Sequence, residues 1–125
     1  MKPPSRQPAI RVTMRPKDTN ALGSIFGGVI TSLIDEAAFV EATRQAPRRY
    51  VTVAMEKIEF HKPVRVGDIV SLWAETVEIG RTSIRMRVDV LVRCRESDED
   101  IRVTSAEVTM VATDDSNRPT PIFNA

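Results

Sequence analysis

The sequence predicts an α+β fold in which one long helix packs against an antiparallel sheet. Apolar residues at helical spacing run from about Gly28 to Ala46, and Pro47 ends the pattern. Four long segments rich in β-branched residues follow, separated by short turns. Short turns imply antiparallel neighbours, because parallel strands need crossovers of about a dozen residues or more. A lone apolar helix and such a meander bury their apolar faces only against each other, so we expect the sheet to wrap around the helix.

The strand segments are recognised by alternation of apolar and polar residues and by the turn residues between them. The clearest alternation runs from Ile84 to Cys94, where charged residues occupy four of the five positions in between. We expect one domain over residues 1–125, with loose tails at 1–7 and 115–125, because these ends are rich in proline and polar residues. The expected strands cover residues 8–14, 50–60, 69–79, 82–95 and 101–113.

Composition excludes several classes of function. The 125 residues carry 18 Lys and Arg against 17 Asp and Glu, a net charge of +1, which argues against a dedicated nucleic-acid binder. The single Cys94 excludes an intramolecular disulfide and a cysteine-based metal site, and His61 is the only histidine. No apolar run is long enough to cross a membrane, and the N-terminus lacks a signal-peptide pattern. We therefore expect a cytoplasmic protein without a metal site.

One acidic residue interrupts the face of the helix opposite the apolar stripe. Thr31, Ser32 and Phe39 share this face with Asp35, and no basic residue occurs before Arg44. A solvent-facing helix normally carries basic residues and Glu–Lys pairs there. We therefore expect a helix that is buried on most sides, with Asp35 as its unusual member. A carboxylate held in low dielectric is a stronger base toward water, although most such residues are simply solvated.

Two glycines stand where the helix begins. Gly27 and Gly28 would offer unpaired backbone N–H groups at the positive end of the helix dipole, which suits a developing oxyanion. Glycine also lets a carbonyl approach the backbone closely. A flexible entry into the helix explains the same two residues equally well, so the pattern alone leaves both interpretations open.

Further short sequence motifs occur along most of the chain, from about Arg11 to Ile122. In this order and spacing they resemble the hotdog-fold acyl-CoA thioesterases, and among them the YciA-type acyl-CoA hydrolases. The resemblance implies the hotdog fold, a long central helix wrapped by a five- to six-stranded antiparallel sheet. The motifs are Asp18-Thr19-Asn20, Ile25-Phe26-Gly27-Gly28, Asp35-Glu36-Ala37-Ala38, Val51-Thr52-Val53-Ala54, Phe60 with Lys62-Pro63, Val66-Gly67-Asp68 and Gly80-Arg81-Thr82-Ser83-Ile84.

The resemblance implies hydrolysis of acyl-CoA thioesters to a free acid and CoA, with no cofactor because CoA is part of the substrate. By this resemblance Asp35 is the general base or the nucleophile, and the thioester carbonyl points to the N–H groups near Gly28. Asn20 matches a residue that orients the water or the carbonyl from the opposite subunit, although asparagine is also common in loops. The site is then shared between two chains of a dimer, and such dimers often assemble into hexamers as trimers of dimers, with tetramers as a further arrangement.

The resemblance also assigns residues to substrate binding. Phe26 and Gly27 lie beside the expected oxyanion site, and Lys62 follows the second strand. The turn residues Arg81, Thr82 and Ser83 would hold the phosphates of CoA, because Arg binds phosphate bidentately and hydroxyls add donors. A solvated turn is nearly as good an interpretation of this last group.

Other activities fit the sequence less well. A hotdog hydratase or dehydratase uses a histidine with a carboxylate, and the helix region has no histidine. A non-catalytic acyl-CoA binding or sensing protein has no need for a buried acid such as Asp35. A purely structural assembly protein explains the sheet but not Asn20, Gly28 and Asp35 together.

Overall fold

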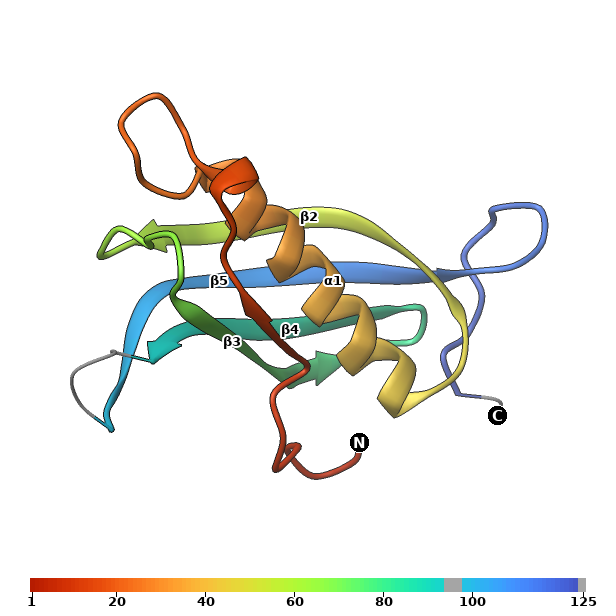
Figure 1. The fold of residues 1–125 in the computed structure, drawn as a ribbon. Coiled ribbons are helices and arrows are strands. Elements are labelled where there is room, and N and C mark those ends of the chain that lie inside the picture. Colours follow the sequence, from red (N-terminus) through yellow and green to blue (C-terminus); the bar gives the residue numbers. More distant parts are fainter. Residues whose placement is uncertain (94–97, 124–125) are drawn as a thin grey trace.

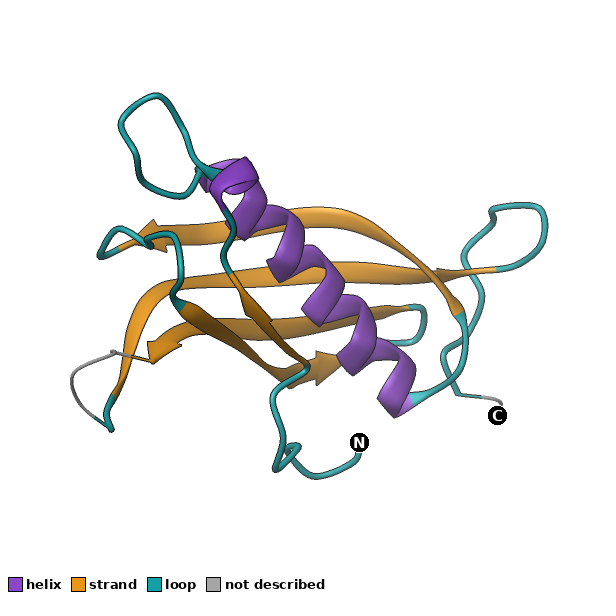
Figure 2. Cartoon of the chain, viewed as in Figure 1, coloured by secondary structure: helices purple, strands orange, loops and turns teal. Residues whose placement is uncertain are grey.

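A computed structural model describes residues 1–93 and 98–123 and confirms the α+β architecture, with one long helix in front of a five-stranded sheet (Figures 1 and 2). The helix ends at Gln45, within one residue of the predicted end at Ala46, and Pro47 follows as the predicted helix breaker. Cys94 and Arg95, which the sequence places in the fourth strand, lie outside the described residues. In chain order the elements are β1 (Ile10–Thr13), the short 3-10 helix η1 (Pro16–Asp18), α1 (Gly27–Gln45), β2 (Arg49–Phe60), β3 (Ile69–Ile79), β4 (Ser83–Arg93) and β5 (Asp100–Thr113).

The strand order is β1-β3-β4-β5-β2, with every neighbouring pair antiparallel. Strands β3, β4 and β5 form the expected meander, but β2 pairs with β5, so that Tyr50 lies opposite Ala112. The expectation that β2 continues directly into the meander is therefore wrong. The eight residues 61–68 instead cross three strand spacings, about 14 Å, which is well within their reach.

The apolar stripe of α1 packs on the sheet, mainly on β3 and β4 (Figure 1). Ile30, Ile34 and Ala38 are fully buried or nearly so, and they join the inward side chains of the strands in one core. The opposite side of the helix is open in this single chain, where Phe39 is 45% exposed. The expectation of a helix buried on most sides is therefore confirmed except along this one exposed stripe.

A charged residue lies in this core near the end of α1. Glu41 is 2% exposed and accepts hydrogen bonds from Arg44 (2.7 and 3.0 Å), Gln45 (3.2 Å) and Thr76 of β3 (2.5 Å). Burial alone would raise the pKa of Glu41, but the hydrogen bonds from Arg44, Thr76 and Gln45 outweigh it and hold the pKa below 4.5. A buried carboxylate therefore fastens the helix to the sheet.

The two ends of the chain are attached to this frame. The N–H of Lys2 donates to Oε1 of Gln45 at 2.7 Å, which holds the N-terminus against the end of α1. Ile122 is fully buried, and its N–H donates to the carbonyl of Arg81 at 2.9 Å. The expectation of a loose tail over 115–125 is thus wrong around Ile122, because an isoleucine side chain gains more by burial than its backbone loses by ordering.

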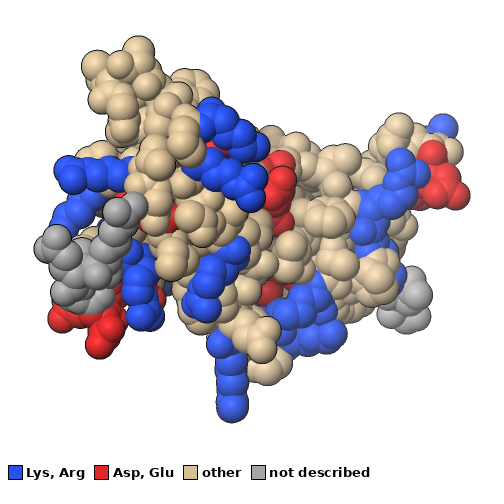
Figure 3. Space-filling model, in the orientation of Figure 1, with Lys and Arg blue, Asp and Glu red and all other residues tan. Residues whose placement is uncertain are grey.

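Lys and Arg side chains lie in several separate groups on the face shown in Figure 3, with Asp and Glu between them. Across residues 1–93 and 98–123, no helix has the length and apolar character needed to span a bilayer.

Candidate active site

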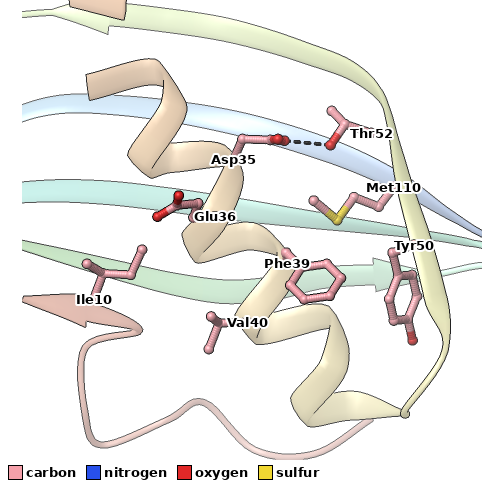
Figure 4. A pocket seen from close by; sticks show the side chains of 8 residues that line it. All are labelled: Ile10, Asp35, Glu36, Phe39, Val40, Tyr50, Thr52 and Met110. Atoms are coloured by element: carbon pink, nitrogen blue, oxygen red, sulfur yellow. Dashed lines mark hydrogen bonds between the residues drawn. The ribbon is translucent and has the colours of Figure 1, made fainter. Parts of the chain in front are cut away.

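Asp35 lies on the open side of α1, facing the edge strand β2. The hydroxyl of Thr52 donates a hydrogen bond to Oδ1 of Asp35 at 2.5 Å (Figure 4). This bond joins two elements that otherwise pack less closely than the rest of the helix and sheet. It fixes one carboxylate oxygen and leaves the second oxygen available for another partner.

The sequence analysis assigned no role to Thr52, although this residue belongs to one of the motifs on which the family resemblance rests. A signal was present. Thr52 is two residues from Tyr50, so both side chains lie on the same face of β2, and Tyr50 is buried. Thr52 is exposed in this chain, but its place on the face directed at the helix brings its hydroxyl within reach of Asp35.

Asp35 and Thr52 border an open groove of about 500 Å³ over the outer side of α1 (Figure 4). This volume lies within the range of roughly 300–1,000 Å³ that small-molecule sites occupy. The remaining lining is mostly apolar and comes from β1, α1, β2 and β5. These residues are Ile10, Glu36, Phe39, Val40, Tyr50 and Met110. The groove therefore combines a carboxylate with an apolar surface suited to a hydrocarbon group.

The start of α1 leaves backbone donors available. The N-cap residue Phe26 makes no side-chain capping bond, and the first turn contains no acidic residue. No described residue accepts a hydrogen bond from the N–H of Gly27 or Gly28. A Cβ at Gly28 would lie 2.5 Å from Cε1 of Phe26, whereas one at Gly27 would meet only Phe60, at 3.7 Å. Glycine at 28 thus lets the aromatic ring of Phe26 lie against the helix start.

Asn20 shapes its own loop in this chain. Its Oδ1 accepts hydrogen bonds from the N–H groups of Leu22 (2.8 Å) and Ser24 (3.2 Å), and its Nδ2 donates to Oγ of Ser24 (3.0 Å). This is the ordinary turn-forming use of asparagine. The predicted role in orienting water or carbonyl stays a prediction, and the loop geometry holds the amide in a fixed place before the helix.

Gly28 and Asp35 are seven residues apart on the same helix. Seven residues advance about 10 Å along the axis and return to nearly the same side. A thioester carbonyl that accepts hydrogen bonds at the helix start needs its attacking group within about 3.5 Å of the carbonyl carbon. Acting as a nucleophile, Asp35 therefore cannot reach a carbonyl that is held by Gly28 of the same chain, and acting as a general base it would need a water molecule to bridge the gap.

The residues expected to bind CoA fall into two groups at opposite ends of the sheet (Figure 1). Lys62 lies beside the helix start, in a smaller pocket of about 190 Å³ that Gly27 and the half-exposed Phe60 also line. Arg81 and Thr82 lie in the turn between β3 and β4, and Ser83 is the first residue of β4. This turn is at the other end of β3 from Lys62, and β3 spans about 36 Å. The structure brings Lys62 and Gly27 together and keeps both away from the Arg81 turn.

Comparison with known families identifies the family to which the chain belongs. Residues 22–96 match the model of the family described as the thioesterase superfamily, which covers the helix, β2, β3 and β4. The chain belongs to the thioesterase superfamily. The prediction of a hotdog-fold thioesterase is confirmed at this level.

Relatives of this thioesterase carry more specific names. A protein of Zymomonas mobilis, named as an uncharacterized acyl-CoA thioester hydrolase, is 46% identical over 116 residues, 93% of this chain and 78% of the relative. The acyl-CoA thioester hydrolase YciA of Salmonella typhimurium is 36% identical over 122 residues, 95% of this chain and 92% of the relative. The thioesterase therefore spans most of the length of both.

Solved structures agree with the fold of this thioesterase. Cj0915, a hexameric hotdog fold thioesterase of Campylobacter jejuni, matches with a TM-score of 0.88 and 39% identity, over 94% of this chain and 90% of that one. The hexameric thioesterase y2039 from Yersinia pestis matches with a TM-score of 0.89 and 35% identity, over 98% and 100% of the two chains. The hotdog fold expected from the sequence is thus confirmed.

Within residues 1–93 and 98–123 the thioesterase has no cluster of three His, Cys, Asp or Glu side chains able to hold a metal ion. The expectation that the site uses no metal and no cofactor stays a prediction.

Proposed function

We propose that this thioesterase is an acyl-CoA thioester hydrolase that releases CoA and a free carboxylic acid. The observation that carries the proposal is the hydrogen-bonded pair of Asp35 and Thr52 at the border of an apolar groove. The names of the Zymomonas and Salmonella relatives support the same substrate class. A non-catalytic acyl-CoA binder is the second candidate, and nothing in its function would need a carboxylate held at the groove by a dedicated donor.

Asp35 is proposed as general base or nucleophile, with Thr52 as a positioning residue. In the general-base route, the free carboxylate oxygen takes a proton from water while the water oxygen attacks the thioester carbon. The C–S bond then breaks, and the CoA thiolate leaves and takes a proton. Backbone N–H groups at a helix start stabilise the oxyanion formed between these steps. Only water is consumed, so the proposal includes no cofactor.

The seven-residue separation of Gly28 and Asp35 supports a composite site. Strand β2 is an edge strand with exposed Val51 and Val53, which leaves one side open for pairing with a second copy. Two edges related by a two-fold axis pair antiparallel, and the helix-start end of one chain then lies beside the opposite end of the other. We therefore propose that Asn20 and Gly28 of one chain complete the site of the Asp35 of its partner.

The same pairing unites the two groups of CoA-binding candidates. Lys62 of one chain and the Arg81 turn of the other come to the same end of the joined sheet, although they lie far apart within one chain (Figure 1). Three such dimers would form a hexamer, and the Campylobacter and Yersinia thioesterases are described as hexameric. We propose this trimer of dimers for the present chain.

Thiol release from a panel of acyl-CoAs tests the activity. Asp35→Asn removes the carboxylate but keeps its size, and we expect kcat to fall at least about a hundredfold, as for the loss of a general base. Glu75→Gln is the matched control, because Glu75 is an exposed acid on β3 away from the groove. Binding of acyl-CoA without any hydrolysis by the wild type would favour the non-catalytic candidate. Equal rates in wild type and Asp35→Asn would refute the role of Asp35 alone.

Mixing two inactive variants tests the shared site. Asn20→Ala and Asp35→Asn damage opposite halves of a composite site, so a mixed dimer holds one intact site and one doubly damaged site. After subunit exchange, half of the dimers are mixed, and about a quarter of wild-type activity should return. A mixture no more active than its separate components would show that each site belongs to one chain.

A further inference from the structure

The groove beside Asp35 has an end wall built on β2. Tyr50 is 9% exposed, and its hydroxyl donates to the carbonyl of Ala46 at the end of α1 at 2.7 Å. Burial raises the pKa of Tyr50 above its usual value of 10.0, although the charge of Arg48 lowers it, so the phenol keeps the proton that it donates. The ring therefore links β2 to the helix and has little freedom to swing away.

Two apolar side chains complete this part of the groove. Met110 lies opposite Thr52 on the neighbouring strand β5 and is 2% exposed, so it forms a floor. The ring of Phe39 points from α1 toward β2 (Figure 4). Phe39 makes no polar contact within the described chain and is nearly half exposed. The groove thus has a fixed end at Tyr50, a fixed floor at Met110 and an adaptable side at Phe39.

The distance from the reacting carboxylate to the end wall follows from regular geometry. Thr52, which holds Asp35, is two residues from Tyr50, or about 7 Å along a strand. Phe39 is four residues beyond Asp35, or about 6 Å along the helix axis. An extended chain advances about 1.2 Å per covalent bond, given roughly 3.5 Å for the three bonds of one residue. At most about six carbon atoms of an acyl group therefore fit between the carboxylate and the wall.

We propose that Tyr50 is the residue that limits how much of the acyl chain this site binds, with Met110 as the floor of an acyl pocket about six carbons deep. The inference rests on the proposed acyl-CoA hydrolase function. The apolar lining favours the hydrocarbon end of the substrate here, whereas the smaller pocket beside Lys62 adds Lys62 and His61 to an otherwise apolar lining. Carbons beyond the sixth meet the anchored ring and gain no further contact.

Rates measured with saturated acyl-CoAs of two to twelve carbons test this limit. Each methylene buried in the pocket should raise kcat/KM about threefold to fourfold, and the increase should stop near six carbons. In Tyr50→Ala the increase should continue for about two to four more carbons, because the wall is removed. Tyr50→Phe is the matched control: it loses only the hydroxyl, so its increase should stop at the same length as in the wild type.

A second variant tests whether the acyl chain lies in this groove if Tyr50→Ala does not fold. Phe39→Ala removes the exposed side of the groove without opening the core, and it should reduce the gain per methylene to about twofold or less while the stopping length stays the same. A chain-length profile that is unchanged in both Tyr50→Ala and Phe39→Ala would overturn the inference and leave the hydrolase intact. Absence of hydrolysis with every acyl-CoA would instead overturn the proposed function, and this inference with it.

Discussion

Replacing Glu41 with glutamine is expected to lower the free energy of unfolding at pH 7 by about 3 kcal/mol. The carboxylate of Glu41 accepts four hydrogen bonds in a buried position, from Arg44, Gln45 and Thr76. Glutamine has nearly the same size, so the change tests the charge and the hydrogen bonds rather than the packing. Its amide nitrogen would face donors where the carboxylate presents an acceptor.

The magnitude follows from these contacts. The hydrogen bond from the Thr76 hydroxyl is buried and charge-assisted, so its loss costs about 2 kcal/mol. The side chain of Arg44 is 28% exposed and recovers hydration, so the loss of its ion pair adds only about 1 kcal/mol. For a domain of 125 residues, 3 kcal/mol corresponds to a fall in Tm of about 10 °C.

The effect depends on pH in a defined direction. The pKa of Glu41 is lower in the folded protein than its usual 4.5, because the hydrogen bonds from Arg44, Thr76 and Gln45 together exceed the opposing effect of burial. Its contribution to stability is therefore complete above about pH 4.5 and is lost as the pH falls through the lower folded value. The difference in free energy of unfolding between wild type and Glu41→Gln should therefore become smaller in that acid range.

Urea unfolding followed by circular dichroism at pH 7, 5 and 3.5 measures this difference in the free energy of unfolding. Protein concentration is held constant, because self-association shifts apparent stability. Glu75→Gln serves as control and should change stability by less than about 0.5 kcal/mol, since its side chain is exposed. Equal stability of wild type and Glu41→Gln at pH 7 would refute the reasoning, as would a gap that widens on acidification.

Three further changes probe the site and the fold. Thr52→Val should lower kcat about tenfold, because the carboxylate of Asp35 loses the hydrogen bond that positions it, and Thr52→Ser should restore the rate; initial rates at saturating acyl-CoA measure both effects. Gly28→Ala should reduce kcat/KM at least about tenfold, because the new Cβ would displace the ring of Phe26 from the helix start. Gly27→Ala has space for its Cβ and should change kcat/KM less than about threefold. Ile122→Ala should lower the free energy of unfolding by about 3 kcal/mol, as thermal unfolding will show. A loose tail would instead give no measurable change.

Local pattern was sufficient for the elements and for Asp35. The apolar stripe, the breaker Pro47 and the alternation in β4 are properties of neighbouring residues, and they placed the helix and strands within a few positions. The pairing of β2 with β5 was missed, because a connection of eight residues is long enough for either neighbour and carries no sign of its partner.

The site shows the same division between local and long-range information. Thr52 was missed because its role depends on α1 and β2 lying side by side, and the spacing along the chain does not encode this contact. The burial of Ile122 was missed for a related reason, since a single isoleucine in a polar tail forms no periodic pattern. The separation between Lys62 and the Arg81 turn follows from the length of β3, which lies between them and was predicted from the sequence.

The irregularities of β2 bear on how the protein avoids misassembly. The pairing with β5 shifts register at Val53 and again before Glu59, and Lys57 between them has a positive φ of 54°. A straight open edge of twelve residues would accept a strand from any exposed sheet in several alignments, which is how aggregates grow. The bulges bend the edge and leave short regular stretches that match only a strand bent in the same way. A second copy of the chain meets that condition, and an unrelated or unfolded strand does not.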